Sequence, residues 1–209
     1  MKENIFAIKR GRNLVGHGFL SNGYFITAVH VLRYNENSFV EIKGEKIEFD
    51  KAVPLYVGRG KDNDPNFIDL VFFKFKNIEG GFPVLDYTPQ KDEVLKSCCL
   101  CKVKNDNLCN IEYELDVVPA YSLGEAEGNY FHCKCNRDES SSGSPLLKDN
   151  HVIGIMHGGR RVEELVQEGY LSEEEKRAYN LEDDDKICSF LRIGAFMSLI
   201  ENEKYNNKV

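Results

Sequence analysis

Residues 16–32 read GHGFLSNGYFITAVHVL, and this stretch predicts a β-hairpin. The pair Asn22-Gly23 favours a two-residue hairpin turn, because both positions adopt positive φ at little cost. The apolar runs on its two sides predict a hairpin from Gly18 to Ala28. His30 follows where the second strand ends, so packing can hold one edge of its ring while the other edge faces a cleft. A histidine at a strand end is more often structural, so partners elsewhere must decide its role.

The rest of the chain repeats this pattern of short apolar strands separated by Gly, Asn, Asp and Pro. Many short strands with almost no helix predict antiparallel barrels or a sandwich. A chain of 209 residues with 42% hydrophobic content is long enough for one large domain or two small packed ones.

Charge and cysteine content limit the class of partner and the compartment. The net charge of -7, without a cluster of Lys and Arg, argues against nucleic acid as a partner and favours a polypeptide or a small molecule. We expect no membrane association, because no stretch is long enough to span a bilayer and residues 1–10 lack the features of a secretion signal. Seven cysteines, an odd number, favour a reduced, intracellular (cytoplasmic) setting over a disulfide-linked secreted fold.

Two segments break the strand pattern. Residues 162–186 carry ten acidic and three basic side chains, a local charge of -7. Ser172 and Glu175 fit a capping box, which predicts a short helix over residues 173–179. We interpret the segment as a solvated surface insertion, the alternative being a lid that selects substrates. From Ile193 to about Tyr205, apolar residues at helical spacing predict a terminal helix packed on the body.

Two further stretches contain residue types that suit catalysis. Asp69 precedes the apolar run Leu70–Phe75. A carboxylate entering a core is costly unless it accepts hydrogen bonds, and a histidine N–H would be a suitable donor; alternatively Asp69 only caps the strand. In residues 140–147, SSSGSPLL, small residues around Ser142 allow a tight turn whose backbone N–H groups converge on one point, as an oxyanion requires.

Taken together, these segments resemble the trypsin/chymotrypsin family of serine peptidases, in which His, Asp and Ser occur in this order. Residues 27–30, TAVH, are similar to the family's Thr-Ala-Ala-His segment, and residues 69–71, DLV, to its Asp-Ile-Ala segment. Residues 142–145, SGSP, match the second half of its Gly-Asp-Ser-Gly-Gly-Pro signature, in the variant of staphylococcal glutamyl endopeptidases and HtrA-like proteases. Residues 154–159, GIMHGG, fall where the family has the strand that lines the specificity pocket.

The resemblance implies an all-β fold of two antiparallel six-stranded barrels packed face to face, with a C-terminal helix. The first barrel would span residues 1–88. The second would span residues 89–209, including the acidic insertion 162–186 and the terminal helix. Together they would form one peptidase domain, with the active site in the crevice. A polypeptide substrate would bind there as an added strand, without a cofactor or a metal.

The same resemblance assigns roles to individual residues of a serine endopeptidase. Ser142 would be the nucleophile that forms the acyl-enzyme, His30 the general base, and Asp69 the group that orients the imidazole. The backbone N–H groups of Ser140 and Ser142 would form the oxyanion hole. A catalytically silent, protease-like module that binds peptides or proteins is the alternative from a different class, and an esterase with the same triad is a third.

The nucleophile turn departs from the family at two positions. Ser140 replaces a glycine that helps to aim the oxyanion N–H, so the hole is expected to be strained or unformed without substrate. Ser141 replaces the aspartate that pairs with a newly released N-terminus in trypsin-like zymogens. We therefore expect control by an activating partner, by substrate or by additional domains rather than by N-terminal clipping.

Substrate specificity stays open at this level. The resemblance places Asn136 near the pocket floor and adds Met156, His157, Gly158 and Gly159 to its wall. His157 lies one residue later than the pocket histidine of glutamyl endopeptidases, and one step along a strand reverses the side-chain direction, so glutamate specificity does not carry over. Arg160 and Arg161 favour acidic substrates, whereas the acidic insertion favours basic ones.

The cysteines allow two interpretations. Cys99-x-Cys101 and Cys133-x-Cys135 could supply thiolates to a structural zinc, as in some viral members of this fold. The same spacing describes two core cysteines on one strand face, which is the interpretation we favour. No cysteine lies in the Gly-Ser-Pro turn, which argues against a cysteine nucleophile.

Overall fold

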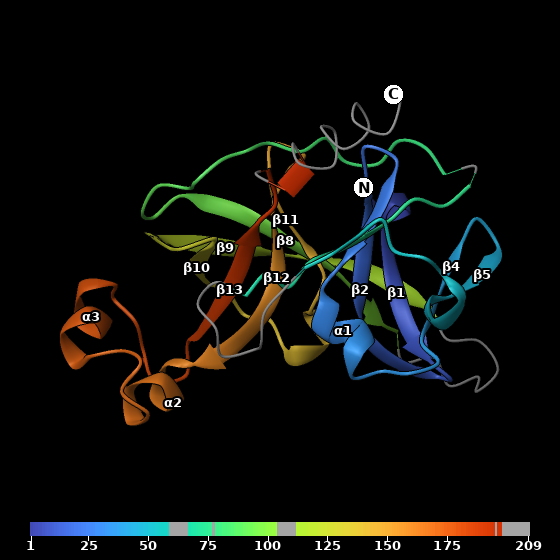
Figure 1. Cartoon of the computed structure of the whole chain (residues 1–209). Coiled ribbons are helices and arrows are strands. Elements are labelled where there is room, and N and C mark those ends of the chain that lie inside the picture. The colour runs from blue at the N-terminus through green and yellow to red at the C-terminus, as the bar shows by residue number, and fades with distance from the viewer. Residues whose placement is uncertain (59–66, 77, 104–111, 195, 198–209) are drawn as a thin grey trace.

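The computed structural model describes residues 1–58, 67–76, 78–103, 112–194 and 196–197. Its strands form two antiparallel sheets, one from residues 5–73 and one from residues 94–192 (Figure 1). The predicted boundary at residues 88 and 89 falls between these two sheets, in the connection from β7 to β8.

The N-terminal sheet has seven strands in the order β5-β4-β1-β2-β3-β7-β6. They are β1 (Ile5–Arg10), β2 (Asn13–Ser21), β3 (Tyr24–Thr27), β4 (Phe39–Ile42), β5 (Glu45–Glu48), β6 (Tyr56–Val57) and β7 (Val71–Phe73). Strands β2 and β3 form the predicted hairpin, in which Ser21 pairs with Tyr24 around Asn22 and Gly23. The φ angles of those two turn residues are 47° and 77°, the positive values that the Asn-Gly pair favours.

The C-terminal sheet closes into a barrel of six strands in the order β10-β13-β12-β11-β8-β9. They are β8 (Val94–Lys102), β9 (Tyr113–Glu127), β10 (Tyr130–Lys134), β11 (Pro145–Lys148), β12 (His151–Arg161) and β13 (Lys186–Arg192). Its interior is filled by apolar side chains such as Leu95, Phe131, Leu146, Ile153 and Phe190. Closure pairs every strand on both sides, which removes exposed edges.

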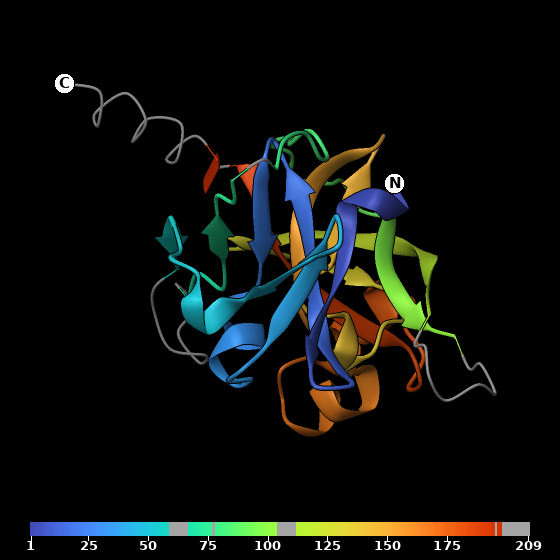
Figure 2. The ribbon, with the colours of Figure 1, turned by 90° about the vertical axis from the view of Figure 1, so that its right-hand side faces the viewer.

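The helices are few and short. They are α1 (Val29–Arg33), α2 (Val162–Gln167), α3 (Glu173–Ala178) and the 3-10 helices η1 (Lys2–Asn4), η2 (Phe49–Lys51) and η3 (Glu139–Ser141). The predicted capping box begins α3: the Glu175 N–H donates to Ser172 Oγ at 3.1 Å, and the Ser172 N–H donates to Glu175 Oε2 at 2.8 Å. Helices α2 and α3 lie at the left and lower left of the molecule in Figure 1, and the same orange segment lies below the strands in Figure 2. None of the helices in the described segments has the length and apolar character needed to cross a membrane.

One hydrophobic core joins the two sheets. Phe19, Phe25 and Phe72 of the first sheet belong to the same buried cluster as Leu147 and Leu191 of the barrel. A separate small cluster is formed by Val162, Leu171, Leu181 and Ile187, so the insertion has apolar anchors of its own on the barrel. The two sheets therefore have a shared core, which fixes the crevice between them.

The fold agrees with the all-β, chymotrypsin-like prediction, with one difference in the first half. The N-terminal sheet has seven strands instead of six, because the short edge strand β6 adds to β7, and it is not closed within the described residues. Most of the predicted terminal helix, from Ile193 to about Tyr205, lies outside the described residues. Of its predicted apolar stripe, Phe196 and Met197 are described and are buried.

Candidate active site

The first sheet supplies a histidine and an aspartate that are in direct contact. His30 lies in the first turn of α1, directly after β3, and Asp69 lies just before β7. The His30 backbone N–H donates to Asp69 Oδ1 at 2.9 Å, and its Nδ1 lies 2.5 Å from Asp69 Oδ2. The sequence predicted that His30 ends a strand, but strand β3 ends at Thr27 and His30 lies in the short helix α1, which begins at Val29. The short helix is what aims its backbone N–H at the carboxylate.

A second histidine contacts the same carboxylate oxygen. Nδ1 of His157, on β12, also lies 2.5 Å from Asp69 Oδ2. The Asp69 side chain is completely buried. Burial favours its neutral form, but hydrogen bonds from His157 and His30 outweigh that effect and hold the pKa of Asp69 well below its ordinary value. An ionised carboxylate only accepts hydrogen bonds, so both Nδ1 atoms carry the proton.

The barrel supplies the serine of the sequence motif. Ser142 follows η3 and precedes Gly143, whose φ of 80° is accessible at little cost only to glycine. The Gly143 N–H donates to the Met156 carbonyl at 2.8 Å, which fixes the turn on β12. The Ser142 hydroxyl donates to the His157 carbonyl at 3.3 Å. His30 and Ser142 line the same cavity, but no hydrogen bond joins the His30 ring to the Ser142 hydroxyl among the described contacts.

The turn that contains Ser142 is docked on β2 of the first sheet at His17. The His17 N–H donates to the Ser142 carbonyl at 2.8 Å, and His17 Nδ1 donates to the Ser140 carbonyl at 2.9 Å. The other ring nitrogen lies 3.0 Å from both the Leu100 N–H, which can donate to it, and the Leu100 carbonyl oxygen. A Cβ on Gly143 would lie 2.1 Å from the His17 carbonyl oxygen, so only glycine permits this approach.

The two expected oxyanion donors lie in this turn. The Ser141 N–H donates to the Asp138 carbonyl at 3.1 Å, and the Ser140 hydroxyl donates to Asp138 Oδ1 at 2.6 Å. Burial would raise the pKa of Asp138, but hydrogen bonds from the Ser140 hydroxyl and backbone N–H outweigh it and lower that pKa. In this state the Ser140 hydroxyl is thus tied to Asp138.

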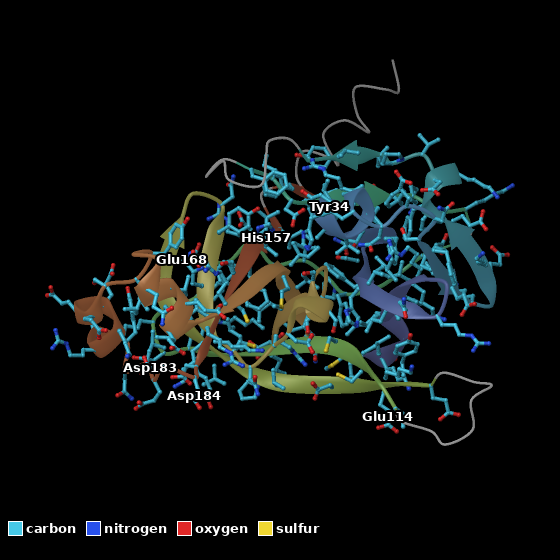
Figure 3. All side chains as sticks on the ribbon, turned by 90° about the horizontal axis from the view of Figure 1, so that it is seen from below. Tyr34, Glu114, His157, Glu168, Asp183 and Asp184 are labelled. Atoms are coloured by element: carbon cyan, nitrogen blue, oxygen red, sulfur yellow. The ribbon has the colours of Figure 1, made fainter. Side chains whose placement is uncertain are left out.

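A cavity of about 930 Å³ lies over the site. One side is formed by residues of β2 and α1, including Leu14, Val15 and His30. The opposite side includes residues of the acidic insertion, namely Leu165, Tyr170, Leu171, Glu175 and Tyr179. Figure 3 shows His157 between Tyr34 and Glu168, near the middle of the molecule. The insertion therefore forms part of the cavity wall in addition to the solvated surface predicted for it.

The strands β10, β12 and β13 line another part of the cavity. His132 and Ser189 face each other across β10 and β13, with His132 Nδ1 3.0 Å from Ser189 Oγ. Gly158 pairs with Ser189 on the neighbouring strand and also lines the cavity, as does Gly159. Asn136, expected at the pocket floor, is exposed and does not line the cavity. Met156 is completely buried behind the wall.

The six described cysteines are free thiols, and most are buried. Cys99 Sγ lies 3.8 Å from Cys101 Sγ, and Cys101 Sγ lies 3.7 Å from Asp116 Oδ2, a spacing that a metal ion could bridge. However, Arg137 already forms an ion pair with Asp116, and burial raises the pKa of Cys99 to about 12. Both features disfavour the thiolates and free carboxylate that zinc binding needs. The group His30, Asp69 and His157 has similar spacing, but its Nδ1 protons are engaged by the carboxylate.

Three features of the site were not predicted as such from the sequence. The sequence analysis included His17 only as part of a longer stretch. The feature that could have indicated its role is a polar residue between two glycines, Gly16 and Gly18, in an apolar strand. His157 was expected in the pocket wall, where it does lie, but its bond to Asp69 was not foreseen. His132 and Ser189 have no local signal, because their meeting depends on the register of β10 and β13.

No protein-family model matches the sequence, and no curated protein is similar to it in sequence. Among solved structures, neuropsin, a serine protease of mouse brain, is 13% identical with a TM-score of 0.62, covering 96% of this chain and 93% of its own. The serine protease of a human pathogenic astrovirus is 14% identical with a TM-score of 0.53, covering 92% and 91%. The serine protease domain of the Sesbania mosaic virus polyprotein is 14% identical with a TM-score of 0.56, covering 91% and 88%.

These likenesses define the class of fold. The chain has the trypsin/chymotrypsin fold, as the sequence resemblance implied. Its neighbours within that fold include proteases of animals and of viruses, to each of which it is similar at low identity.

The buried His17 predicts a pH-dependent stability. Burial outweighs its backbone hydrogen bonds and lowers its pKa to about 4, so the folded protein binds this proton less readily than the unfolded chain. Its contribution is present above the unfolded pKa and is lost as the pH falls from about 6.5 towards 4. Between pH 7 and 5, wild type should lose about 2 kcal/mol more unfolding free energy than His17→Gln, measured by urea denaturation. Equal losses in the two proteins would contradict this assignment.

Proposed function

We propose that this chain is a serine endopeptidase that uses Ser142, His30 and Asp69 to form and hydrolyse an acyl-enzyme. The observation that supports this most directly is the bond from His30 Nδ1 to the buried, ionised Asp69, with His30 and Ser142 lining one cavity. The Nδ1–H tautomer leaves Nε2 of neutral His30 as a base. Several structural neighbours are proteases, including the tobacco etch virus protease solved in complex with its product.

The chemistry begins with a rotation of the Ser142 side chain. Its hydroxyl leaves the His157 carbonyl and donates to His30 Nε2, which removes the proton as Oγ attacks the peptide carbonyl. Asp69 stabilises the imidazolium that forms. His30 then protonates the departing amine, and the sequence repeats with water to release the acyl group.

The oxyanion requires two backbone donors in the turn around Ser142. The Ser142 N–H is one expected donor, and the Ser140 N–H is the second. Each such donor contributes about 3 kcal/mol to stabilisation of the transition state.

The cavity indicates the side chain that precedes the cleaved bond. Among the lining residues from β10, β12 and β13, His132 and Ser189 are adjacent polar groups and none is acidic. Glu175, the acidic residue from α3, already accepts hydrogen bonds from Ser172. Arg160 forms an ion pair with Glu168 at 2.5 Å and lies over the Tyr170 ring, so neither charge dominates the cavity. A carboxamide or carboxylate side chain fits these partners better than a basic one.

Covalent labelling tests the nucleophile. A fluorophosphonate probe should modify wild type at Ser142, located by peptide mass spectrometry, and should leave Ser142→Ala unmodified. His30→Ala should slow labelling by several orders of magnitude, because the hydroxyl then has no base. A folded wild type that resists the probe under conditions that label trypsin would favour the silent binding module instead.

A peptide library tests the specificity. Cleavage should occur after Gln or Glu in preference to Lys or Arg, because His132 and Ser189 can donate hydrogen bonds to a side-chain oxygen. Ser189→Ala should lower kcat/KM for the preferred peptide about tenfold or more, the value of one hydrogen bond to a polar or charged group. The probe-labelling rate of the same variant, which does not depend on that side chain, serves as the control. Preferred cleavage after basic residues would refute this assignment.

A further inference from the structure

His157 has an arrangement that a pocket-wall residue does not need. Strand β12 has an irregularity at this residue, because Met156 pairs with Phe190 while Gly158 pairs with Ser189. His157 is thus the extra residue of a β-bulge, and a bulge redirects a side chain relative to its neighbours. Here it turns the imidazole towards Asp69, 88 positions away in the sequence.

The ring is held in this orientation by aromatic neighbours. The Tyr130 ring lies 5.4 Å and the Phe67 ring 5.9 Å from the His157 ring, between centroids. The Tyr130 hydroxyl donates to the Phe67 carbonyl at 3.0 Å, which ties the two neighbours together. The His30 ring packs edge-on at 5.4 Å and 87°. The two histidines therefore approach Asp69 from two directions.

We propose that His157 is a positioning residue of the catalytic site: its Nδ1–H shares Asp69 Oδ2 with His30, and its carbonyl oxygen holds the resting Ser142 hydroxyl. This inference rests on the proposed function. With the His30 backbone N–H on Oδ1, the carboxylate has three donors, which fix both its position and its rotation. A carboxylate held in this way fixes in turn the plane of the His30 ring.

The second contact gives His157 a role in the resting state. The Ser142 hydroxyl bonds to the His157 carbonyl at 3.3 Å, a long distance for an O–H donor and therefore a weak bond. His157 of β12 thus binds Asp69 through a short hydrogen bond from its side chain and binds Ser142 through a longer, weaker one to its carbonyl. The serine is released at small cost when substrate enters, whereas Asp69 and His30 stay in place.

Two substitutions of His157 distinguish the effect of its N–H donor from the effect of its ring. His157→Asn keeps an N–H donor near the position of Nδ1, whereas His157→Phe keeps a ring of similar shape without a donor. For His157→Phe we expect kcat to fall about 10- to 100-fold with little change in KM, the value of one hydrogen bond to a charged group. His157→Asn should recover most of that loss. His151→Asn, at the other end of β12, is the matched control and should behave as wild type.

The pH dependence of kcat/KM provides a second test, because it would not change if His157 had only a structural role. The titratable groups around Asp69 in the described parts of the chain are His30, His157 and Tyr130, with Arg33 over the Phe67 ring. Without the His157 donor, the carboxylate is a stronger acceptor for protonated His30. The acidic limb of the kcat/KM profile should therefore move to higher pH in His157→Phe and return towards wild type in His157→Asn. A folded His157→Phe with wild-type kcat and profile would overturn the proposal.

A measurement without turnover separates this proposal from the proposed function. In Ser142→Ala labelled with 15N-histidine, NMR should show two low-field Nδ1–H signals, from His30 and His157. Adding His157→Phe should remove one signal and shift the other, because the two protons share one oxygen. An unshifted His30 signal would overturn the positioning role. If wild type resists the fluorophosphonate probe but the signals behave as described, the proposed function fails and the shared carboxylate stands.

Discussion

The docking of the nucleophile turn on the His17 backbone is the contact on which the rest of the site depends. His30 and Asp69 belong to the first sheet and Ser142 to the barrel, so the proposed catalytic chemistry needs the two halves in one fixed register. Two hydrogen bonds from His17, to the carbonyls of Ser142 and Ser140, set that register directly at Ser142. Gly143 allows the close approach, and the burial that keeps His17 neutral also makes this joint sensitive to acid.

The ionised Asp69 places a second constraint on the same interface. A buried carboxylate is stable only with several donors, and its donors come from α1 in the first half and from β12 in the second. Separation of the halves would leave this charge without the His157 bond. Asp69 therefore also contributes to the cohesion of the two sheets.

The sequence predicts the parts of this site that depend on local pattern. The Asn22-Gly23 turn, the α3 capping box and the contexts of His30, Asp69 and Ser142 all follow from periods and turn residues over a few positions. The bulge at His157 cannot be predicted from local pattern, because it depends on the register between β12 and β13. The bulge also breaks the simple alternation of side-chain directions along a strand, so the direction of the His157 side chain could not be read from its sequence position. The extra edge strand β6 is only two residues long, too short for a periodic signal.

Net charge describes the cavity-facing side of the acidic insertion poorly, because most of the insertion's acidic side chains do not line the cavity. Arg160 pairs with Glu168, Lys176 with Asp183, and Glu175 caps its own helix, so the surface facing the cavity is largely aromatic and aliphatic. Charges that are tied in this way attract a distant ligand only weakly and are screened further by salt. Selectivity in such a cavity then depends on short-range contacts with its walls. At the cavity itself, Arg160 is offset by Glu168, and Glu175 is the acidic side chain that the insertion contributes to the described lining.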